Sequence, residues 1–226
     1  MPKTRSTSKS SELLPLKLYA AASPSGFRVA TILEFLGLEY KIQTVNLKAK
    51  EQKEQWYLDL NPNGKIPTLV DPNTGFTITQ TAAVAQYLVD TYDPDHKVSF
   101  KYGSEEYYKQ LEYINLSVSE FAAINSQLFF FKRMAGTNDE FAITHLSNEV
   151  NRIISVFEQL LSKNTKSGLY FIGDHYSIVD ASIYGWSRYL AMNEIDVTQF
   201  KLFKQWYDNF DQDETVQRGV TRLLHN

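Results

Sequence analysis

Apolar positions in the first part of the chain switch repeatedly between the spacing of a strand and that of a helix. Strands are predicted at 16–20, 39–47, 66–70 and 76–79, helices at 26–36 and 80–92, and an irregular short helix within 48–60. The order strand, helix, strand implies a parallel pair, and the later hairpin implies an antiparallel one. We therefore predict a small mixed sheet of four strands with helices packed on it.

Turn-forming residues lie on both sides of the third predicted strand. Asn61–Lys65 (NPNGK) is a turn by composition, and Asp71–Gly75 (DPNTG) closes the hairpin to the fourth strand. Pro67 has no N–H to give to a sheet ladder. Because the X–Pro peptide bond adopts the cis form most readily, we predict a cis bond between Ile66 and Pro67.

The second half of the chain shows helical spacing almost throughout. Helices are predicted at 105–135, 139–161, 177–192, 199–210 and 214–224, with a loop at 163–168. The predicted fold class is therefore α/β followed by all-α. Its parts are a disordered tail at 1–14, a mixed α/β domain at 15–92, a linker at 93–104 and an all-helical domain at 105–226.

Composition narrows the chemistry. The chain has 226 residues, a formal net charge of -3 and no cysteine. Disulfides, cysteine-ligated zinc and a cysteine nucleophile are thus excluded, and with no basic excess we expect no nucleic-acid partner. No apolar run reaches the roughly 18 residues of a membrane span, and the polar start lacks the apolar core of a secretory signal. We expect no membrane segment and no metal.

Motifs in both halves, in a fixed order, carry a family resemblance. They are the segment 61–69 (NPNGKIPTL), the pair Gln80–Thr81 at a predicted helix start, and the segment 173–180 (GDHYSIVD). With the order of strands and helices, they make the chain from 16 to 224 similar to the soluble glutathione transferases. The resemblance implies a thioredoxin-like glutathione-binding domain before the helical domain. It also implies a cytoplasmic homodimer with a role in detoxification.

The resemblance assigns glutathione contacts to separate segments. The backbone of Ile66, before the proline, would bond to the tripeptide, and Gln80 and Thr81 would hold its γ-glutamyl end. A helix start favours a carboxylate there. Many members have Glu and Ser at this pair, so Gln80–Thr81 is a variant form. The glutathione-binding residues implied in this way are Phe27, Gln52, Lys53, Lys65, Ile66, Pro67, Gln80 and Thr81.

The thiol of glutathione must be held as a thiolate, the reactive form. A hydroxyl after the first strand and before the first helix could donate to it. Ser25 and Ser23 are the two leading catalytic candidates, and Tyr19 is the third. The sequence SPSG at 23–26 resembles the T/S-P-N-G loop of the bacterial Nu-class transferases and the related yeast nitrogen-regulator class. Ser25 stands where those proteins typically have Asn.

The resemblance implies that the substrate is a small electrophile or a disulfide. Since the chain has no cysteine, glutathione must supply every thiol in a disulfide reduction. Nu-class relatives accommodate two glutathione molecules or one oxidised glutathione, and Phe27 or Arg28 could line such a second site here. For the electrophile pocket between the domains, the aromatic run at 129–131 offers Phe130, and Arg133 follows it.

Two features of the sequence bear on whether the chain is an enzyme and by which residues. Ser177 and Asp180 have the spacing of a helix-capping pair, so we interpret them as a folding element and not as a triad with His175. A non-catalytic regulator or scaffold of the same fold is the alternative function, because Ser25 departs from the usual Asn. A membrane-inserting, chloride-channel-like member is a third alternative, but it would lack the cysteine usual in that group.

Overall fold

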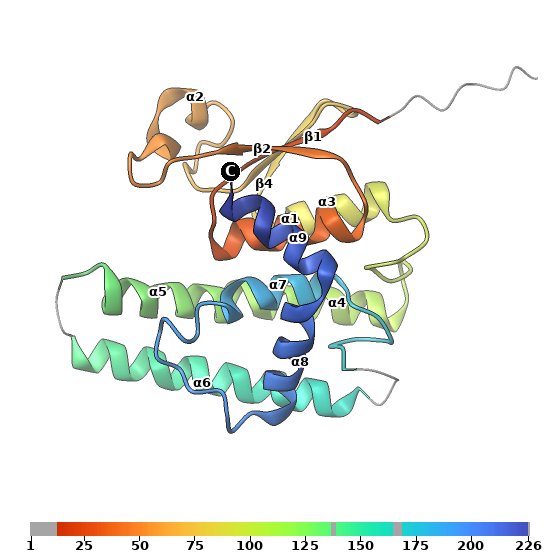
Figure 1. Ribbon diagram of the computed structural model, residues 1–226. Helices are drawn as coiled ribbons and strands as arrows, with labels where there is room; N and C mark the ends of the chain where they lie inside the picture. The colour runs from red at the N-terminus through yellow and green to blue at the C-terminus, as the bar shows by residue number, and fades with distance from the viewer. Residues whose placement is uncertain (1–12, 137–138, 165–168, 226) are drawn as a thin grey trace, which may run out of the picture.

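The computed structural model describes residues 13–136, 139–164 and 169–225. The predicted tail at 1–14 therefore lies outside the described residues up to residue 12, as do positions 165–168 of the predicted loop at 163–168. The elements form a sheet at one end of the molecule, with helices beneath it and a helical bundle beyond them (Figure 1).

The sheet has four strands, β1 (Leu16–Ala20), β2 (Tyr40–Thr44), β3 (Thr68–Asp71) and β4 (Phe76–Thr79). Their order is β2-β1-β3-β4, with β1 and β2 parallel and the other pairs antiparallel. The predicted mixed four-stranded sheet is confirmed. Along β1 the buried residues alternate with more exposed ones, which is the pattern of a strand with one face on the core.

The third strand begins later than its sequence predicts. The bond between Ile66 and Pro67 is cis, as predicted, and β3 starts at Thr68. The cause of the difference is Pro67, which has no N–H for the ladder and which follows a residue outside the sheet. Ile66 consequently lies ahead of the strand and outside the sheet.

Three helices belong to the sheet region. Helices α1 (Pro24–Phe35) and α3 (Thr81–Tyr92) lie between the sheet and the helical bundle (Figure 1). The short helix α2 (Gln55–Leu58), preceded by the 3₁₀ turn η1 (Glu51–Lys53), fills the predicted irregular stretch. The first turns of α1 and α3 both lie beside the segment that precedes β3.

The helical region is all-α, as predicted, and its first predicted helix is divided. It consists of α4 (Glu105–Leu116), the π-helical turn η2 (Ser117–Phe121) and α5 (Ala122–Arg133). The others are α6 (Glu140–Lys163), α7 (Ile178–Ser187), α8 (Lys201–Gln212) and α9 (Glu214–Leu224). Helix α7 ends before the predicted Met192, in turns that lead to Glu194 with a left-handed φ of 57°. No helix among the described residues is long and apolar enough to cross a membrane.

The segment between α3 and α4 has no regular structure but is tied down. The buried carboxylate of Asp93 accepts hydrogen bonds from the N–H groups of Lys97 and Val98 at 2.7 and 3.0 Å. The carbonyl of Val98 in turn accepts from the N–H of Ile178 at 2.9 Å, at the start of α7. This segment is thus fixed to both the helix before it and the helical bundle.

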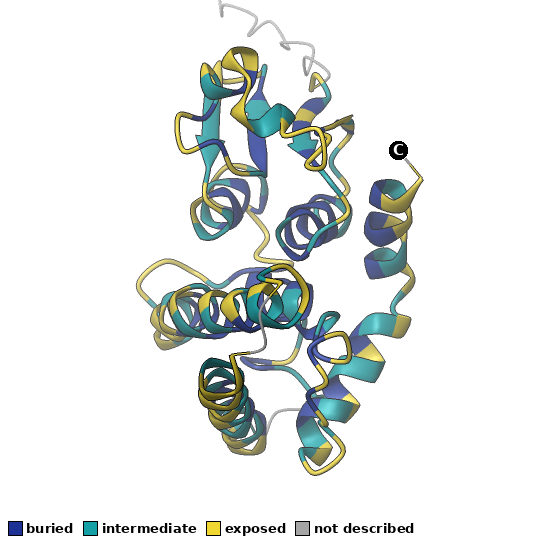
Figure 2. Cartoon of the chain, turned by 90° about the vertical axis from the view of Figure 1, so that its left-hand side faces the viewer, coloured by how far each residue is buried: buried dark blue, intermediate teal, exposed yellow. Residues whose placement is uncertain are grey.

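Helix α1 is the contact between the two regions. A Cβ at Gly185 of α7 would lie 2.3 Å from the carbonyl oxygen of Pro24, and one at Gly219 of α9 would lie 3.0 Å from the backbone of Ala30. Both helices therefore approach α1 backbone to backbone. The helix that ends at the C mark in Figure 2, α9, turns its buried side toward the helices beneath the sheet. One continuous hydrophobic cluster runs through both regions.

Candidate functional site

A small cavity of about 120 Å³ lies where the first turns of α1 and α3 meet the segment before β3. Its lining residues are Ser25 from α1, Asn61, Asn63, Lys65, Ile66 and Pro67 from the segment before β3, and Gln80 and Thr81 from the start of α3. Most of the residues predicted to bind glutathione, together with one candidate hydroxyl, therefore lie around one space.

The start of α1 separates the two serine candidates. The Ser23 hydroxyl caps the helix, because its Oγ accepts from the N–H of Gly26 at 3.2 Å. Pro24 follows at the first helical position, where its missing N–H costs no bond. Ser25 is half-buried, lines the cavity and makes no hydrogen bond through its hydroxyl within the described chain. Ser25 is thus the hydroxyl available to a ligand.

Tyr19, the third hydroxyl candidate, lies outside the cavity lining. It is half-buried on β1 and its ring packs against Trp56 with centroids 6.3 Å apart. Gly26 explains how closely the loop folds back beside Ser25, since a Cβ at that position would lie 2.3 Å from the carbonyl oxygen of Ala21. The loop is therefore compact, and it presents Ser25 to the cavity.

The segment before β3 is shaped by Asn61, which is buried. Its side-chain amide donates to the carbonyl of Lys65 at 2.6 Å, and its Oδ1 accepts from the N–H of Asn63 at 3.0 Å. The hydroxyl of Tyr57 donates to the same Lys65 carbonyl at 3.0 Å. Within the described chain, the N–H and C=O of the next residue, Ile66, make no hydrogen bond. The backbone of Ile66 is thus free to bond to an extended ligand.

The start of α3 is an uncapped helix terminus. Gln80 precedes the helix with a left-handed φ of 67°, and its side chain makes no capping bond. The first-turn N–H groups are therefore left for another acceptor, and the helix dipole favours an anion there. Thr81, the first helical residue, receives a hydrogen bond on its Oγ1 from Nη1 of Arg28 at 3.1 Å. The arrangement suits a carboxylate.

The predicted contacts Gln52 and Lys53 lie in η1, beside the cavity and not in its lining. The Lys53 ammonium is 3.4 Å from the carbonyl oxygen of Asn63, and a Cβ at Gly64 would lie 2.9 Å from it. Lys65 lines the cavity and is exposed. Of the two lysines, Lys65 is therefore the one placed to meet a ligand carboxylate.

Two predicted ligand contacts belong to the core instead. The Phe27 side chain is 4% exposed, and the guanidinium of Arg188 lies 5.1 Å from the centre of its ring. Arg28, a candidate for a second glutathione site, is 2% exposed. The reason is helical geometry: both residues follow Ser25 along α1, but their side chains point to the helices packed on it. We therefore remove Phe27 and Arg28 from the residues that touch a ligand.

The electrophile-pocket candidates lie on α5. Phe130 is 44% exposed and packs edge-on against Phe131. The guanidinium of Arg133 donates to the carbonyl of Met192 at 3.1 Å and pairs with Glu194 at 3.1 Å. Arg133 is thus held by the loop after α7, and a part for Phe130 and Arg133 in an electrophile pocket stays a prediction.

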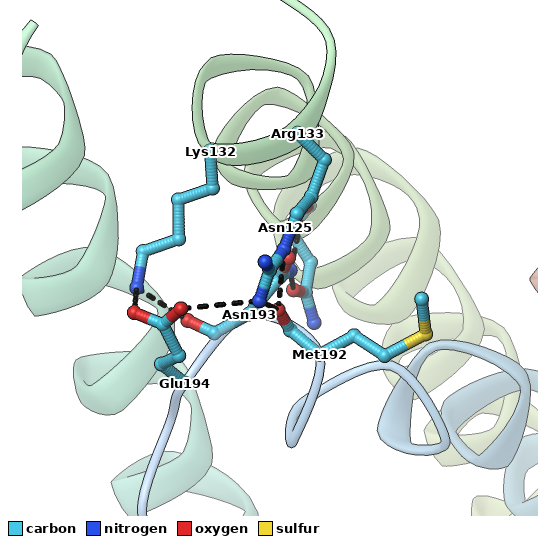
Figure 3. A network of polar contacts seen from close by, with 6 residues as sticks. All are labelled: Asn125, Lys132, Arg133, Met192, Asn193 and Glu194. Carbon is cyan, nitrogen blue, oxygen red and sulfur yellow. Dashed lines mark hydrogen bonds and ion pairs between the residues drawn. The ribbon is translucent and has the colours of Figure 1, made fainter. Parts of the chain in front are cut away.

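Arg133 belongs to a larger network that joins the end of α5 to that loop (Figure 3). Lys132 donates to the carbonyl of Asn193 at 2.7 Å and pairs with Glu194 at 2.9 Å. The buried Asn193 side chain donates to the side-chain oxygen of Asn125. The cations at this end of α5 are therefore used to fix the loop.

The segment around Asp180 has the predicted structural role. Ser177 and Asp180 form a capping box at the start of α7, where the N–H of Ser177 donates to Asp180 at 2.8 Å. The Trp206 indole N–H donates to the other carboxylate oxygen at 2.8 Å. Burial raises the pKa of Asp180, although these hydrogen bonds oppose the shift. His175 contacts Asp174 instead, at 3.1 Å, so no triad forms.

Sequence reasoning did not identify Asn61, Asn63 or the contact of Arg28 with Thr81. The asparagines were visible only as turn formers, and their place beside the cavity depends on how the turn folds. Arg28 meets Thr81 across 53 positions in the chain, which no local pattern indicates. Within the described chain, no group of three or more His, Asp or Glu residues could hold a metal ion.

Comparisons with known proteins identify one family over most of the chain. The family model for the glutathione S-transferase N-terminal domain matches residues 14–90, and that for the C-terminal domain matches residues 85–214. Glutathione S-transferase 1 of Schizosaccharomyces pombe is 34% identical over 76% of this chain and 74% of its own length.

Solved structures are similar over nearly the full length. A glutathione transferase homologue from Lodderomyces elongisporus, with two glutathione molecules per subunit, has a TM-score of 0.90 and 40% identity over 92% of this chain and 99% of its own. The glutathione transferase URE2P8 from Phanerochaete chrysosporium, with oxidised glutathione, has a TM-score of 0.87 and 27% identity over 96% of this chain and 100% of its own.

Proposed function

This chain belongs to the glutathione S-transferase family, and we propose that it is an enzyme that uses glutathione bound in the cavity at Ser25, Ile66 and Thr81. The observation that carries the proposal is the meeting of three features in one space. Among the described residues, these are the Ser25 hydroxyl without a hydrogen-bond partner, the Ile66 backbone without hydrogen bonds, and the helix start at Thr81 without a side-chain cap. Each matches a different part of glutathione, which has a thiol, an extended backbone and carboxylates at its ends.

Binding follows from these three features. The N–H and C=O of Ile66 bond to the peptide backbone of glutathione as a neighbouring strand would. The first turn of α3 and the Thr81 hydroxyl hold the γ-glutamyl carboxylate, and Gln80 accepts from the ammonium. Lys65 faces the glycyl carboxylate. Gln52 and Lys53 support the segment that carries Lys65.

The chemistry follows from the start of α1. The Ser25 hydroxyl donates to the sulfur of glutathione, and the positive end of the helix dipole adds to its effect, so the thiolate is favoured over the thiol. Lowering the thiol pKa by two units requires about 2.7 kcal/mol, which one such donor with a helix terminus can supply. Ser23 maintains the helix start, since its hydroxyl is already engaged.

Two reactions are open to this thiolate. It can attack an electrophilic carbon, forming a C–S bond while an electron pair leaves on the departing group or moves to a neighbouring atom. It can instead attack a disulfide, breaking the S–S bond and releasing one thiolate. Because the chain has no cysteine, a second glutathione must then resolve the mixed disulfide and leave as oxidised glutathione. The relatives with two glutathione molecules or with oxidised glutathione support this second reaction.

The test is calorimetric titration with glutathione and with oxidised glutathione, combined with the ultraviolet absorbance of the bound thiolate. Ser25→Ala is the test variant and Ser23→Ala the matched control. We expect both variants to bind glutathione, and only Ser25→Ala to lose the thiolate absorbance and turnover of a chromogenic electrophile or a small disulfide. Retention of the thiolate in Ser25→Ala would refute the role of Ser25.

A non-catalytic regulator or scaffold is the second candidate function. Its support is Ser25, a hydroxyl where the transferases of similar loop sequence typically have an amide. Glutathione binding without any turnover would favour it over the enzyme. We also propose a cytoplasmic homodimer acting in detoxification. Light scattering coupled to size exclusion tests the dimer, since a monomeric mass would contradict it.

A further inference from the structure

Within the part of the chain that the structure describes, Arg28 is a buried cation without an acidic partner. Its side chain is 2% exposed, and its Nε makes no hydrogen bond with any described residue. None of the ion pairs among the residues that the structure describes includes Arg28. Burial alone lowers the pKa of Arg28 to about 10, so the guanidinium remains charged at neutral pH. A buried unpaired charge destabilises a fold, and one that persists calls for a compensating role.

The contacts of Arg28 lead to the cavity. Nη1 donates to Oγ1 of Thr81 at 3.1 Å, and Nη2 lies 3.5 Å from Oγ of Ser117 in the π-helical turn. Because the Thr81 oxygen accepts from Arg28, its own proton is free to point elsewhere, and Thr81 lines the cavity. The guanidinium thus bonds to the hydroxyl of a residue that lines the cavity.

The π-helical turn η2, which begins at Ser117, supports a functional role for Arg28. π-Helical turns inside α-helices frequently lie at functional sites. Here the turn places Ser117, which is itself fully buried, against Arg28 from the helical region. The guanidinium is therefore held between α1, the start of α3 and η2, with its charge fixed in position before any ligand binds.

We propose that Arg28 is a positioning residue for the carboxylate subsite: its buried charge, acting through the Thr81 hydroxyl, makes the start of α3 selective for a ligand that carries a carboxylate there. The inference rests on the proposed function and deepens it, since glutathione presents its γ-glutamyl carboxylate at this subsite. Arg28 itself touches no ligand atom. The occupied subsite supplies the negative charge that the guanidinium lacks in the described chain.

A purely structural role of Arg28 predicts a different effect on ligand affinity. If Arg28 only joined α1 to the helical region through Ser117, its removal would weaken every ligand equally, by loosening the site. The experiment therefore compares two ligands. One is glutathione, and the other is its analogue with 4-aminobutyrate in place of the γ-glutamyl residue. This analogue lacks the α-carboxylate and keeps the ammonium.

The protein variants are Arg28→Gln and, as matched control, Ser117→Ala, which removes the contact to the helical region and leaves Thr81 untouched. For Arg28→Gln we expect about 10- to 30-fold weaker binding of glutathione and less than about threefold weaker binding of the analogue, the scale of one charge-assisted hydrogen bond. For Ser117→Ala we expect less than about threefold for both ligands. Equal losses for both ligands in Arg28→Gln would overturn the inference.

A second measurement uses the unaltered chain, so that the test stands even if Arg28→Gln does not fold. The buried Nε–H of Arg28 is protected from solvent, and its nuclear magnetic resonance signal can be assigned from its absence in Arg28→Lys. We expect this signal to shift on adding glutathione and to shift much less with the analogue. The same shift with both ligands would contradict the inference.

The two proposals fail in different ways. If the unaltered chain bound neither ligand, the proposed function would be lost and this inference with it. If the chain bound both ligands with equal affinity, or if Arg28→Gln lost both equally, glutathione binding would stand and only the role of Arg28 would fall.

Discussion

The starts of α3 and α7 each carry a hydroxyl-bearing residue, but they differ in how their backbone N–H groups are bonded. At α7, Ser177 and Asp180 form a capping box, in which each side chain accepts a hydrogen bond from a backbone N–H of the other's end of the turn. The Trp206 indole N–H donates to the remaining oxygen of the Asp180 carboxylate. At α3, Gln80 makes no capping bond, and Thr81 faces a cavity with its oxygen held from behind by Arg28. Both helix starts bear a hydroxyl, on Ser177 and on Thr81.

The two helix starts differ in whether their backbone N–H groups find hydrogen-bond acceptors within the described chain. A helix start whose N–H groups are all bonded within the chain stabilises the fold and has nothing left for a ligand. One whose N–H groups remain open, next to a cavity and a buried cation, favours a carboxylate. Hydrogen-bond satisfaction therefore separates a folding element from a binding site better than residue type does.

The largest effect is expected at α7. Asp180→Ala removes the buried carboxylate that accepts from Ser177 and leaves the Trp206 N–H without this partner, so the free energy of unfolding should fall by about 4 kcal/mol. Glutathione affinity of the folded fraction should not change. Urea unfolding and calorimetry measure the two quantities. Asp174→Ala, at an exposed position, is the control, with an expected loss below about 0.5 kcal/mol. A loss of affinity in Asp180→Ala would erase the contrast with α3.

The opposite result is expected at α3. Thr81→Val keeps the shape of the side chain and removes the hydroxyl between Arg28 and the ligand. We expect about 20-fold weaker glutathione binding, or about 1.8 kcal/mol, and a loss of stability of about 1 kcal/mol at most. Thr81→Ser retains the hydroxyl and should bind within about threefold of the unaltered chain. A Thr81→Val protein that bound normally would show that α3 is no more functional than α7.

A third buried carboxylate, Asp71, sharpens the comparison through pH. Burial would raise the pKa of Asp71, but hydrogen bonds from Tyr87, Tyr92 and Asn73 outweigh it and lower that pKa. A group with a lowered pKa in the folded state stabilises the fold above its unfolded pKa of about 3.9, and this contribution is lost as pH falls through the folded value.

Asp71→Asn should therefore destabilise the protein by about 1.5 kcal/mol at neutral pH. The gap between the variant and the unaltered chain should stay constant down to about pH 4 and narrow below it. Urea unfolding at a series of pH values measures this gap. A gap that widened on acidification would mean that Asp71 has a raised pKa, like Asp180.

The smallest effect is expected at α1, whose start combines both roles in neighbouring residues. Ser23→Ala should cost about 1 kcal/mol of unfolding free energy through loss of the cap, and Ser25→Ala should cost less than about 0.5 kcal/mol. Thermal unfolding of the two variants side by side measures the difference. Equal costs would show that Ser25 also has a structural partner.

Much of the fold was predictable because local patterns determine it. Strands β1 and β4 and helix α9 have their predicted bounds, since alternation, a DPNTG turn and the apolar spacing of α9 are local signals. The start of β3 was predicted at Ile66, two residues before its place in the structure. Ile66 is apolar and fits the pattern of a strand, but it does not pair in the sheet.

The site was predictable only where a motif carries it. Ile66, Gln80 and Thr81 stand in motifs, and the structure brings them together beside Ser25. The direction in which Phe27 points depends on the helices that cover α1, which adjacency to Ser25 does not reveal. The partner of Arg28 likewise lies in a distant element. Residues of this kind need the tertiary structure.

The packing of α9 on α1 bears on how the protein is made. The guanidinium of Arg222 reaches the carboxylate of Glu34, 188 positions earlier, and the Leu223 side chain lies within 3.3 Å of where a Cβ on Gly26 would be. While the ribosome is still synthesising the helical region, α1 lacks this cover and its apolar side faces solvent. The nascent sheet region should therefore remain vulnerable to proteases and attractive to chaperones until translation has passed α9.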